Sequence, residues 1–451
     1  MNRRRFLSTF SVGAAAAAPL LAGPPASRRP NIVLIMADDL GYECLSCYGS
    51  TSYRTPHLDA LAASGIRFTN AYAQPLCAPT RLQVMTGQYN CRNYEAFGIL
   101  NPKEKTFGHL MQAAGYKTCI AGKWQLYSYN PPGYQPEWRG KGMLPKDSGF
   151  DDYCLWHAGH TEDKGSRYAD PVVMRRDGLH ELKGQYGEDV FASFLTNFME
   201  AHKNEPFFVY YPMVLTHAPF TPTPRSAEWN SGNRHRTDPK FFKDMVEYMD
   251  ATVGRVVESI DRLGLRENTI ILFFSDNGTP KEIESRLGDR TIRGGKGLTT
   301  DAGTHVPLIA NWKGTAPAGK VLDDLIDSTD FLPTIADAAG TKIPREFTVD
   351  GRSFLPQLKG AKGKPREWVY FYYDPRPGWD KEQFSLKICA RDKRYKLYST
   401  GELYDVVADP LEQSPIPAER QTPEARRSRV RLQAVLDDMK KHTKRPPVLA
   451  S

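Results

Sequence analysis

Residues 30–41 read PNIVLIMADDLG, and residues 269–278 read TIILFFSDNG. Each stretch is a short apolar run that ends abruptly in polar side chains. Unbroken apolar runs of this length are typical of strands that are buried on both faces of a parallel sheet. In open α/β sheets, ligands bind beyond the carboxyl ends of the strands. The two runs therefore predict a buried sheet that aims three carboxylates and one amide at a single crevice. These side chains belong to Asp38, Asp39, Asp276 and Asn277.

Carboxylates that converge in a crevice repel one another unless a cation lies between them. A set of oxygen ligands without histidine selects a hard cation, Ca²⁺ or alternatively Mg²⁺, over zinc. Each aspartate could instead cap a turn after its strand, which is a common use of aspartate. Either pair alone would favour the turn, whereas both pairs together favour a metal site.

The rest of the chain alternates short apolar runs with helical patterns. This alternation predicts an α/β fold, a large α/β/α sandwich around a mostly parallel, mixed sheet. Thr55 and Pro56 signal a first helix, which Gly65 ends. Further strands are expected at Phe207–Tyr211 and Val306–Ala310, besides Asn31–Met36 and Thr269–Phe274, and further helices at Asp238–Leu263 and Asp327–Ala339.

The pattern changes after about residue 350, where short strands alternate with turn residues and a charged helix follows at Pro423–His442. We expect a small C-terminal α+β subdomain with a short antiparallel sheet. The predicted division is a catalytic α/β domain over residues 28–350 and this subdomain over residues 351–445. The expected strands of the small sheet are Trp368–Tyr373, Ser385–Ala390 and Tyr395–Tyr398.

Residues 1–26 have the features of a twin-arginine signal peptide. Arg3, Arg4 and Arg5 precede the apolar run Phe10–Leu21, and small residues follow it. An uncleaved anchor is the alternative, but the run is shorter than the ~20 residues that a spanning helix needs. We expect export by the twin-arginine machinery to the periplasm or the medium, and no stable membrane span elsewhere.

The balance of charge is mild. The 451 residues include 60 Lys and Arg against 52 Asp and Glu, a formal net charge of +8. This excess is too small for a histone-like nucleic-acid binder, and it is compatible with an anionic substrate.

Residues 77–81 read CAPTR and carry the most specific signal. Pro79 favours the start of a helix that Gly87 ends, which places Cys77 at a helix N-terminus, where an anion is favoured. Arg81 lies one turn further along and can reach back to Cys77. The segment could be a buried cysteine beside a structural arginine, or a thiolate nucleophile with a lowered pKa.

At this segment the sequence resembles the type I sulfatases of the alkaline phosphatase-like superfamily, whose signature is C-x-P-S-R. Thr80 stands where the family usually has serine. The resemblance extends over several further motifs, in order along the chain from about Pro30 to Gln413. They include the two carboxylate motifs, Thr55–Asp59, Gly65–Tyr72, Gly122–Trp124, Thr216–Pro219, Arg293–Gly297, Asp350–Pro356 and Glu402–Asp405.

The resemblance implies that a maturation enzyme oxidises Cys77 to formylglycine. Hydration of this aldehyde gives a gem-diol, of which one hydroxyl attacks sulfur and the other later expels sulfate. It also implies a Ca²⁺ site, which the modified Cys77 completes, together with basic groups around the sulfate. The implied metal ligands are Asp38, Asp39, Cys77, Asp276 and Asn277, and the implied catalytic residues are Cys77, Arg81, Lys123, His217 and Lys296.

One position departs from the family pattern. The family motif usually reads G-K-W-H, and this chain has Gln125 in place of the histidine that helps the sulfated intermediate to collapse. Glutamine cannot accept a proton at neutral pH, so water or another group must act as base or this step is slow. His157 and His160 are expected to be surface or structural residues outside the site. Cys44 and Cys47 lack the second pair that a zinc site would need.

The expected function is a sulfuric ester hydrolase that acts on a sulfated carbohydrate or an aryl sulfate. A phosphodiesterase or phosphonate hydrolase with the same modified cysteine is the first alternative. A non-catalytic binder of sulfated glycans is the second, and Gln125 motivates it. Selectivity is expected in loops such as residues 128–145 and 222–238.

Overall fold

The structure is a computed structural model that describes residues 29–159 and 164–444. The predicted signal peptide, residues 1–26, lies outside the described residues.

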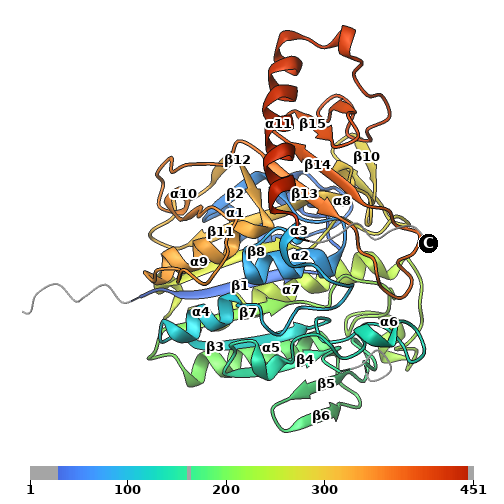
Figure 1. Cartoon of the computed structure of the whole chain (residues 1–451). Helices are drawn as coiled ribbons and strands as arrows, with labels where there is room; N and C mark the ends of the chain where they lie inside the picture. Colours follow the sequence, from blue (N-terminus) through green and yellow to red (C-terminus); the bar gives the residue numbers. More distant parts are fainter. Residues whose placement is uncertain (1–28, 160–163, 445–451) are drawn as a thin grey trace, which may run out of the picture.

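A ten-stranded mixed sheet forms the centre of the molecule (Figure 1). Five adjacent strands at its middle run parallel, whereas β11 and β5 run against their neighbours. The strands in spatial order are β12 (Lys320–Asp327), β2 (Ile66–Tyr72), β11 (His305–Trp312), β8 (Thr269–Ser275), β1 (Asn31–Ala37), β7 (Phe207–Pro212), β3 (Lys117–Lys123), β4 (Asp152–Trp156), β5 (Val172–Arg175) and β6 (Gly178–Glu181).

Helices cover both faces of this sheet. Strand β1 explains why, because its side chains alternate between two apolar cores and all of them are buried. Val33 and Ile35 enter one core, and Leu34 and Met36 enter the other. The first core contains α1 (Pro56–Ala63), α5 (Gly187–Ala201) and α7 (Phe241–Arg262), and the second contains α2 (Cys77–Thr86), α4 (Phe107–Ala113), α9 (Phe331–Ala339) and α10 (Leu355–Leu358).

A second, four-stranded antiparallel sheet lies at the C-terminal end of the chain. One of its faces packs against α11 (Pro423–His442), which stands out from the body of the molecule in Figure 1. Its other face packs on the edge of the large sheet, where Phe371 meets Tyr72 and Leu325. The strands are β13 (Val369–Tyr373), β14 (Lys387–Arg391), β15 (Tyr395–Tyr398) and β16 (Leu403–Asp405).

The remaining elements are short. A two-stranded hairpin pairs β9 (Glu284–Leu287) with β10 (Arg290–Arg293). The other helices are α3 (Asn90–Asn93), α6 (Ala227–Asn230) and α8 (Asp301–Thr304).

The fold class predicted from the sequence is confirmed. The sequence predicted four of the ten strands of the large sheet, and the predicted elements differ from the structure at their ends. The helix expected over Asp327–Ala339 begins only at Phe331, because Asp327 ends β12 and a 3-10 turn, Ser328–Asp330, follows it. The longest helix begins at Phe241 and ends at Arg262. Thr55 precedes α1, but its side chain does not cap the helix and bonds to Ser46 instead.

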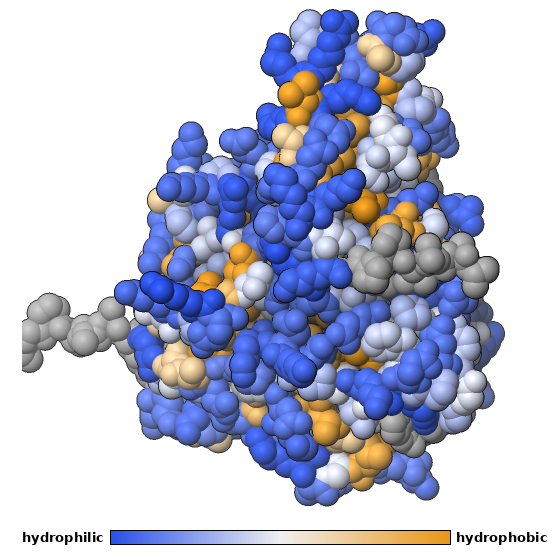
Figure 2. All heavy atoms as spheres, viewed as in Figure 1, coloured by the Kyte–Doolittle hydropathy of each residue, from blue (hydrophilic) through white to orange (hydrophobic). Residues whose placement is uncertain are grey.

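The visible face in Figure 2 is mainly hydrophilic, with small and separate hydrophobic groups. Among the described residues, no helix combines the length and the apolar character needed to cross a membrane. All seven cysteines lie in the described part of the chain, and all are free thiols there. Cys44 and Cys47 therefore form no disulfide in this structure.

Candidate active site

The carboxylates that follow β1 and β8 come together because these two strands are neighbours in register. Ala37 pairs with Ser275, so the residues after each strand emerge side by side. The backbone N–H of Asp39 donates to Asp276 Oδ1 at 3.0 Å, and the Asn277 amide donates to Asp39 Oδ1 at 2.8 Å. Asp38, Asp39, Asp276 and Asn277 are all 0% exposed.

Cys77 lies beside this cluster at the first position of α2. Its residue is 2% exposed, and its thiol donates to Gln125 Oε1 at 3.4 Å. Ligand atoms of Asp38, Cys77 and Asp276 all lie within 4.8 Å of one another. The structure therefore brings together all five residues that the sequence predicted as metal ligands.

The cluster has the oxygen ligands of a site for a hard cation, and one of these oxygens has no hydrogen-bond donor in the part of the chain that the structure describes. Asn277 Oδ1 is buried and has no hydrogen-bond partner among the described residues. A buried carbonyl oxygen without a partner is costly unless a ligand satisfies it. Three carboxylates converge with this oxygen, so the donors suit Ca²⁺ or Mg²⁺ rather than a softer metal.

Three buried or half-buried cations surround the carboxylates. Lys123 Nζ donates to Asp38 Oδ2 at 2.8 Å, and Lys296 Nζ donates to Asp39 Oδ2 at 2.5 Å. Arg81 Nη2 donates to Asp276 Oδ2 at 2.8 Å. The three cations thus come from α2, the end of β3 and the segment after β10, and together they match the three negative charges.

Arg81 has a different partner from the one expected on the sequence. Besides Asp276, its guanidinium donates to the Lys123 carbonyl at 3.2 Å, and its bonds do not go to Cys77. The acceptors are supplied by Asp276, directly after β8, and by Lys123, the last residue of β3. Arg81 therefore joins the metal cluster to the strand that carries Lys123.

Burial and charge act in opposite directions on these groups. Burial opposes the ionisation of Asp38, but the charges of Lys123, Arg81 and Lys296 outweigh it and hold the pKa of that carboxyl well below its usual range. Burial and the adjacent Asp38 carboxylate raise the pKa of Asp276. Two adjacent buried carboxylates are ionised together only where positive charge lies nearby.

His217 faces the same cluster from the loop after β7. Its Nε2 lies 3.1 Å from Lys296 Nζ and 3.7 Å from Asp39 Oδ2, while Nδ1 lies 2.5 Å from the Ala218 carbonyl. Burial and the charge of Lys296 lower the pKa of His217 well below its usual value. The ring is therefore neutral at pH 7, with Nδ1 donating and Nε2 available to exchange a proton.

Two side chains that the sequence analysis did not place in the site lie next to it. His157 is 2% exposed, and its carbonyl accepts from the Gln125 backbone N–H at 3.1 Å. Arg167 lies over the Trp156 ring, 3.9 Å from the centroid. The signal that could have found His157 is its position directly after β4, since the other site residues also follow strands. His160 lies outside the described residues.

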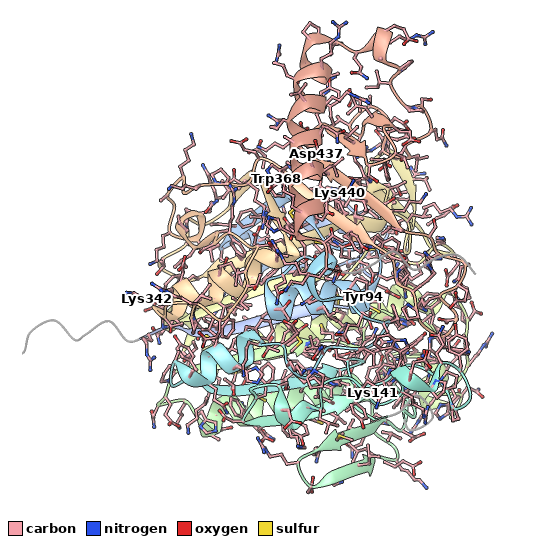
Figure 3. All side chains as sticks on the ribbon, in the orientation of Figure 1. Tyr94, Lys141, Lys342, Trp368, Asp437 and Lys440 are labelled. Carbon is pink, nitrogen blue, oxygen red and sulfur yellow. The ribbon has the colours of Figure 1, made fainter. Side chains whose placement is uncertain are left out.

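The C-terminal part of the chain also reaches the site. Tyr373 and Phe384, on either side of the β13–β14 connection, belong to the apolar cluster around Cys77. Tyr129, from one of the loops expected to govern selectivity, packs against the same cluster. Tyr94, labelled near α2 in Figure 3, donates to the Pro375 carbonyl at 3.0 Å and so holds this connection in place.

Comparisons with known proteins agree with this geometry. The family model described as Sulfatase matches residues 30–341, and one described as N-sulphoglucosamine sulphohydrolase, C-terminal, matches residues 295–442. Human arylsulfatase A is 33% identical over 433 residues, covering 87% of this chain and 79% of its own length. Dog N-acetylgalactosamine-6-sulfatase is 30% identical over 388 residues, covering 78% of this chain and 70% of its own length.

Solved structures share the fold. One structure, from a study of glycosaminoglycan metabolism by Bacteroides thetaiotaomicron, has a TM-score of 0.70 at 25% identity. The match covers 92% of this chain and 100% of the other chain. The phosphonate monoester hydrolase of Agrobacterium radiobacter has a TM-score of 0.66 at 20% identity, covering 92% of this chain and 96% of its own, which is a likeness of fold alone. With a family model over more than half of its length and close relatives among the arylsulfatases, this chain belongs to the sulfatase family and is a sulfuric ester hydrolase with the alkaline phosphatase-like fold.

Proposed function

We propose that this protein removes sulfate from a sulfated carbohydrate or an aryl sulfate with a formylglycine made from Cys77 and with a bound Ca²⁺. One observation carries the proposal. Cys77 stands at the start of α2, within 4.8 Å of metal-ligating atoms of Asp38 and Asp276. No ordinary structural cysteine needs such a setting.

The residues that would hold the metal are Asp38, Asp39, Asp276 and Asn277, together with the modified side chain of residue 77. The unpartnered Oδ1 of Asn277 supports this assignment. A divalent ion in this position supplies positive charge, which lowers the pKa of a bound hydroxyl and neutralises sulfate oxygens.

Formylglycine supplies a hydrated aldehyde whose one hydroxyl attacks sulfur and whose other hydroxyl allows sulfate to leave. Lys123 donates to Asp38, and Lys296 donates to Asp39. From there their ammonium groups can bind the sulfate oxygens, where charge builds up. Arg81 keeps Asp276 and the strand of Lys123 in fixed positions.

His217 is the group placed to pass a proton to the leaving oxygen. Its ring is neutral, so Nε2 must first take up that proton, and the Lys296 ammonium, whose Nζ lies 3.1 Å away, can supply it. The bond from Nδ1 to the Ala218 carbonyl fixes the orientation of the ring. A general acid needs both this reach and a fixed geometry.

We further propose that residues 1–26 direct export through the twin-arginine machinery to the periplasm or the medium, and that a maturation enzyme converts Cys77 beforehand. The division into a catalytic domain of residues 28–350 and a subdomain of residues 351–445 is part of the same proposal. The four-stranded sheet with α11 supports it.

Two measurements test the proposed function. Mass spectrometry of the peptide that contains residue 77 should show formylglycine in place of cysteine. The purified protein should hydrolyse p-nitrophenyl sulfate faster than bis-p-nitrophenyl phosphate, and Cys77→Ala should abolish the activity. A clear preference for the diester would favour the phosphodiesterase alternative, and retention of full activity by Cys77→Ala would contradict the mechanism.

A further inference from the structure

Arg167 is a cation whose position the catalytic cluster does not explain. Its guanidinium lies over the buried Trp156 ring, 3.9 Å from the centroid, and its Nη1 is buried without a hydrogen-bond partner. Within the described residues, no carboxylate forms an ion pair with it. Burying a charged N–H group without an acceptor costs free energy, so such a group is a candidate for binding an acidic ligand.

Both neighbours of Arg167 connect it to the site. Trp156, on which it stacks, pairs in register with Lys123. Tyr168, the next residue, donates from its hydroxyl to the carbonyls of Val214 at 2.8 Å and His217 at 2.5 Å. Arg167 is thus held between the strand of Lys123 and the loop of His217. Its charge also contributes to lowering the pKa of His217.

His157 presents a second unsatisfied group on the same side. Both of its ring nitrogens are buried and lack partners among the described residues, and its ring centroid lies 5.0 Å from that of Trp156. Burial, with the charges of Lys164 and Arg167, keeps the ring neutral by lowering its pKa well below its usual value. A neutral imidazole offers one donor and one acceptor. Arg167 and His157 therefore flank Trp156 with open hydrogen-bonding capacity.

The balance of charge in the site indicates which kind of ligand Arg167 and His157 fit. Lys123, Arg81 and Lys296 match the three carboxylates of the catalytic cluster, so Arg167 is positive charge beyond that balance. The guanidinium fork matches carboxylate and sulfate oxygens, to which it can donate two bonds. Stacking on Trp156 covers the flat face of the guanidinium and leaves the N–H groups at its edge for hydrogen bonds to these oxygens. Lys164 adds a further positive charge nearby.

We infer that Arg167 and His157 form a subsite for a second acidic group, a carboxylate or another sulfate, carried by the alcohol part of the substrate. The assignment to the alcohol part follows from Tyr168, which fixes this subsite to the loop of His217, the proposed acid for the leaving oxygen. This inference rests on the proposed function and narrows it. The preferred substrate is a sulfate ester with at least two negative groups.

The test compares matched sugars, a monosulfated hexosamine and the same sugar with a second sulfate or a linked uronate. We expect the wild-type protein to show a kcat/KM at least about tenfold higher for the doubly acidic sugar. In Arg167→Gln this preference should disappear, with a loss of roughly 10- to 100-fold for the doubly acidic sugar and a change within about twofold for the other, as expected for the loss of one charged contact. His157→Gln should reduce the preference partly. Arg29→Gln is the matched control, because Arg29 also lies over an aromatic ring, that of Tyr116 at 5.1 Å, and precedes β1 at the end opposite to the site residues.

Binding measurements on Cys77→Ala protein separate the two proposals. Calorimetry should show tighter binding of the doubly acidic sugar, and the double variant with Arg167→Gln should bind the two sugars equally. If the wild-type protein hydrolyses no sulfate ester, the proposed function fails while this binding difference still tests the subsite. Equal affinities in Cys77→Ala, or an equal loss on both sugars in Arg167→Gln, would overturn the inference.

Discussion

Gln125 is the residue at which this chain departs most from its family in chemistry. Its side-chain oxygen accepts from the Cys77 thiol, so it faces the reacting position and occupies the place of a proton-accepting group. An amide can hold a hydroxyl there by a hydrogen bond, but it cannot take its proton at neutral pH. In the proposed mechanism, Gln125 leaves the attack on sulfur unaffected, and the release of sulfate then depends on water or a weaker base.

Gln125→His should accelerate turnover. A positioned base contributes 10²- to 10⁴-fold in favourable cases, and we expect about tenfold in kcat when the release of sulfate limits the rate. Rapid-mixing experiments with p-nitrophenyl sulfate should show an unchanged burst and a faster steady state. A slower burst in Gln125→His would mean that Gln125 acts before sulfate release.

A substitution of Tyr168 tests whether the position of His217 depends on the hydrogen bonds that Tyr168 makes to its loop. Tyr168→Phe removes both hydroxyl bonds to the loop of His217 while keeping the ring, which is buried. We expect a loss of about 1 kcal/mol in the free energy of unfolding and a lower kcat for p-nitrophenyl sulfate, with KM nearly unchanged. Tyr48→Phe, which removes a comparable pair of bonds to Phe68 and Leu308, is the control that should affect stability alone.

At the scale of the elements, strand ends explain which parts of the site could be predicted. Asp38, Asp39, Asp276 and Asn277 follow long buried runs, so their convergence follows from the rule for parallel sheets. Lys123 and His217 were placed only by their resemblance to family motifs, because single basic residues carry no periodic signal. Arg167 and Trp156 could not be predicted. Their contact depends on how β4 pairs with β3, and no local pattern encodes that pairing.

The C-terminal strands show the same limit. Three of four were predicted to within two residues at each end, but β16 has only three residues, Leu403–Asp405, and is set by its pairing with β15. The connection between β13 and β14 was not expected to approach Cys77. That approach depends on packing of the small sheet against the edge of the large one.

Arg366 holds this junction of elements together. It donates to Asp330 at 2.7 Å through Nε and to the Tyr89 hydroxyl at 2.9 Å, and both charged groups are buried. Arg366→Met would leave the Asp330 charge without its partner, and we expect a loss of about 3 to 5 kcal/mol in the free energy of unfolding. Denaturant titration measures this loss. Arg394→Met, which removes a guanidinium at the surface from its pairs with Asp405 and Glu424, should cost much less, and equal losses would contradict the assignment.

For the whole molecule, buried acids set the dependence of stability on pH. Burial raises the pKa of Glu188 to about 7, although Tyr211, Leu215 and Val214 donate to it. The folded state therefore holds this proton over a range in which the unfolded chain has released it. Stability is fully present below the unfolded pKa and falls as the pH rises through about 7.

The contribution of Glu188 over this range is on the order of 3 kcal/mol. Asp250, whose pKa burial raises to about 6, acts in the same direction as Glu188, whereas the buried neutral rings of His157 and His217 act in the opposite direction. The test therefore compares two proteins by thermal unfolding: from pH 5 to pH 8 the melting temperature of the wild-type protein should fall relative to that of Glu188→Gln. Glu247→Gln, at an exposed pair, is the control, and the same slope in Glu188→Gln as in the wild-type protein would contradict the prediction.

The contact between the β13–β14 connection and Cys77 has a consequence for engineering and for evolution. Because Tyr373 and Phe384 line the neighbourhood of Cys77, the wall of the reaction chamber is shared between two regions of the gene that lie about 300 codons apart. A chimera that exchanges the last hundred codons with those of a relative would import part of this wall along with the appended sheet. The part of substrate choice that depends on Tyr373 and Phe384 should then change with the C-terminal exchange, while the reaction itself and the contacts of Arg167 and His157 stay with the N-terminal part.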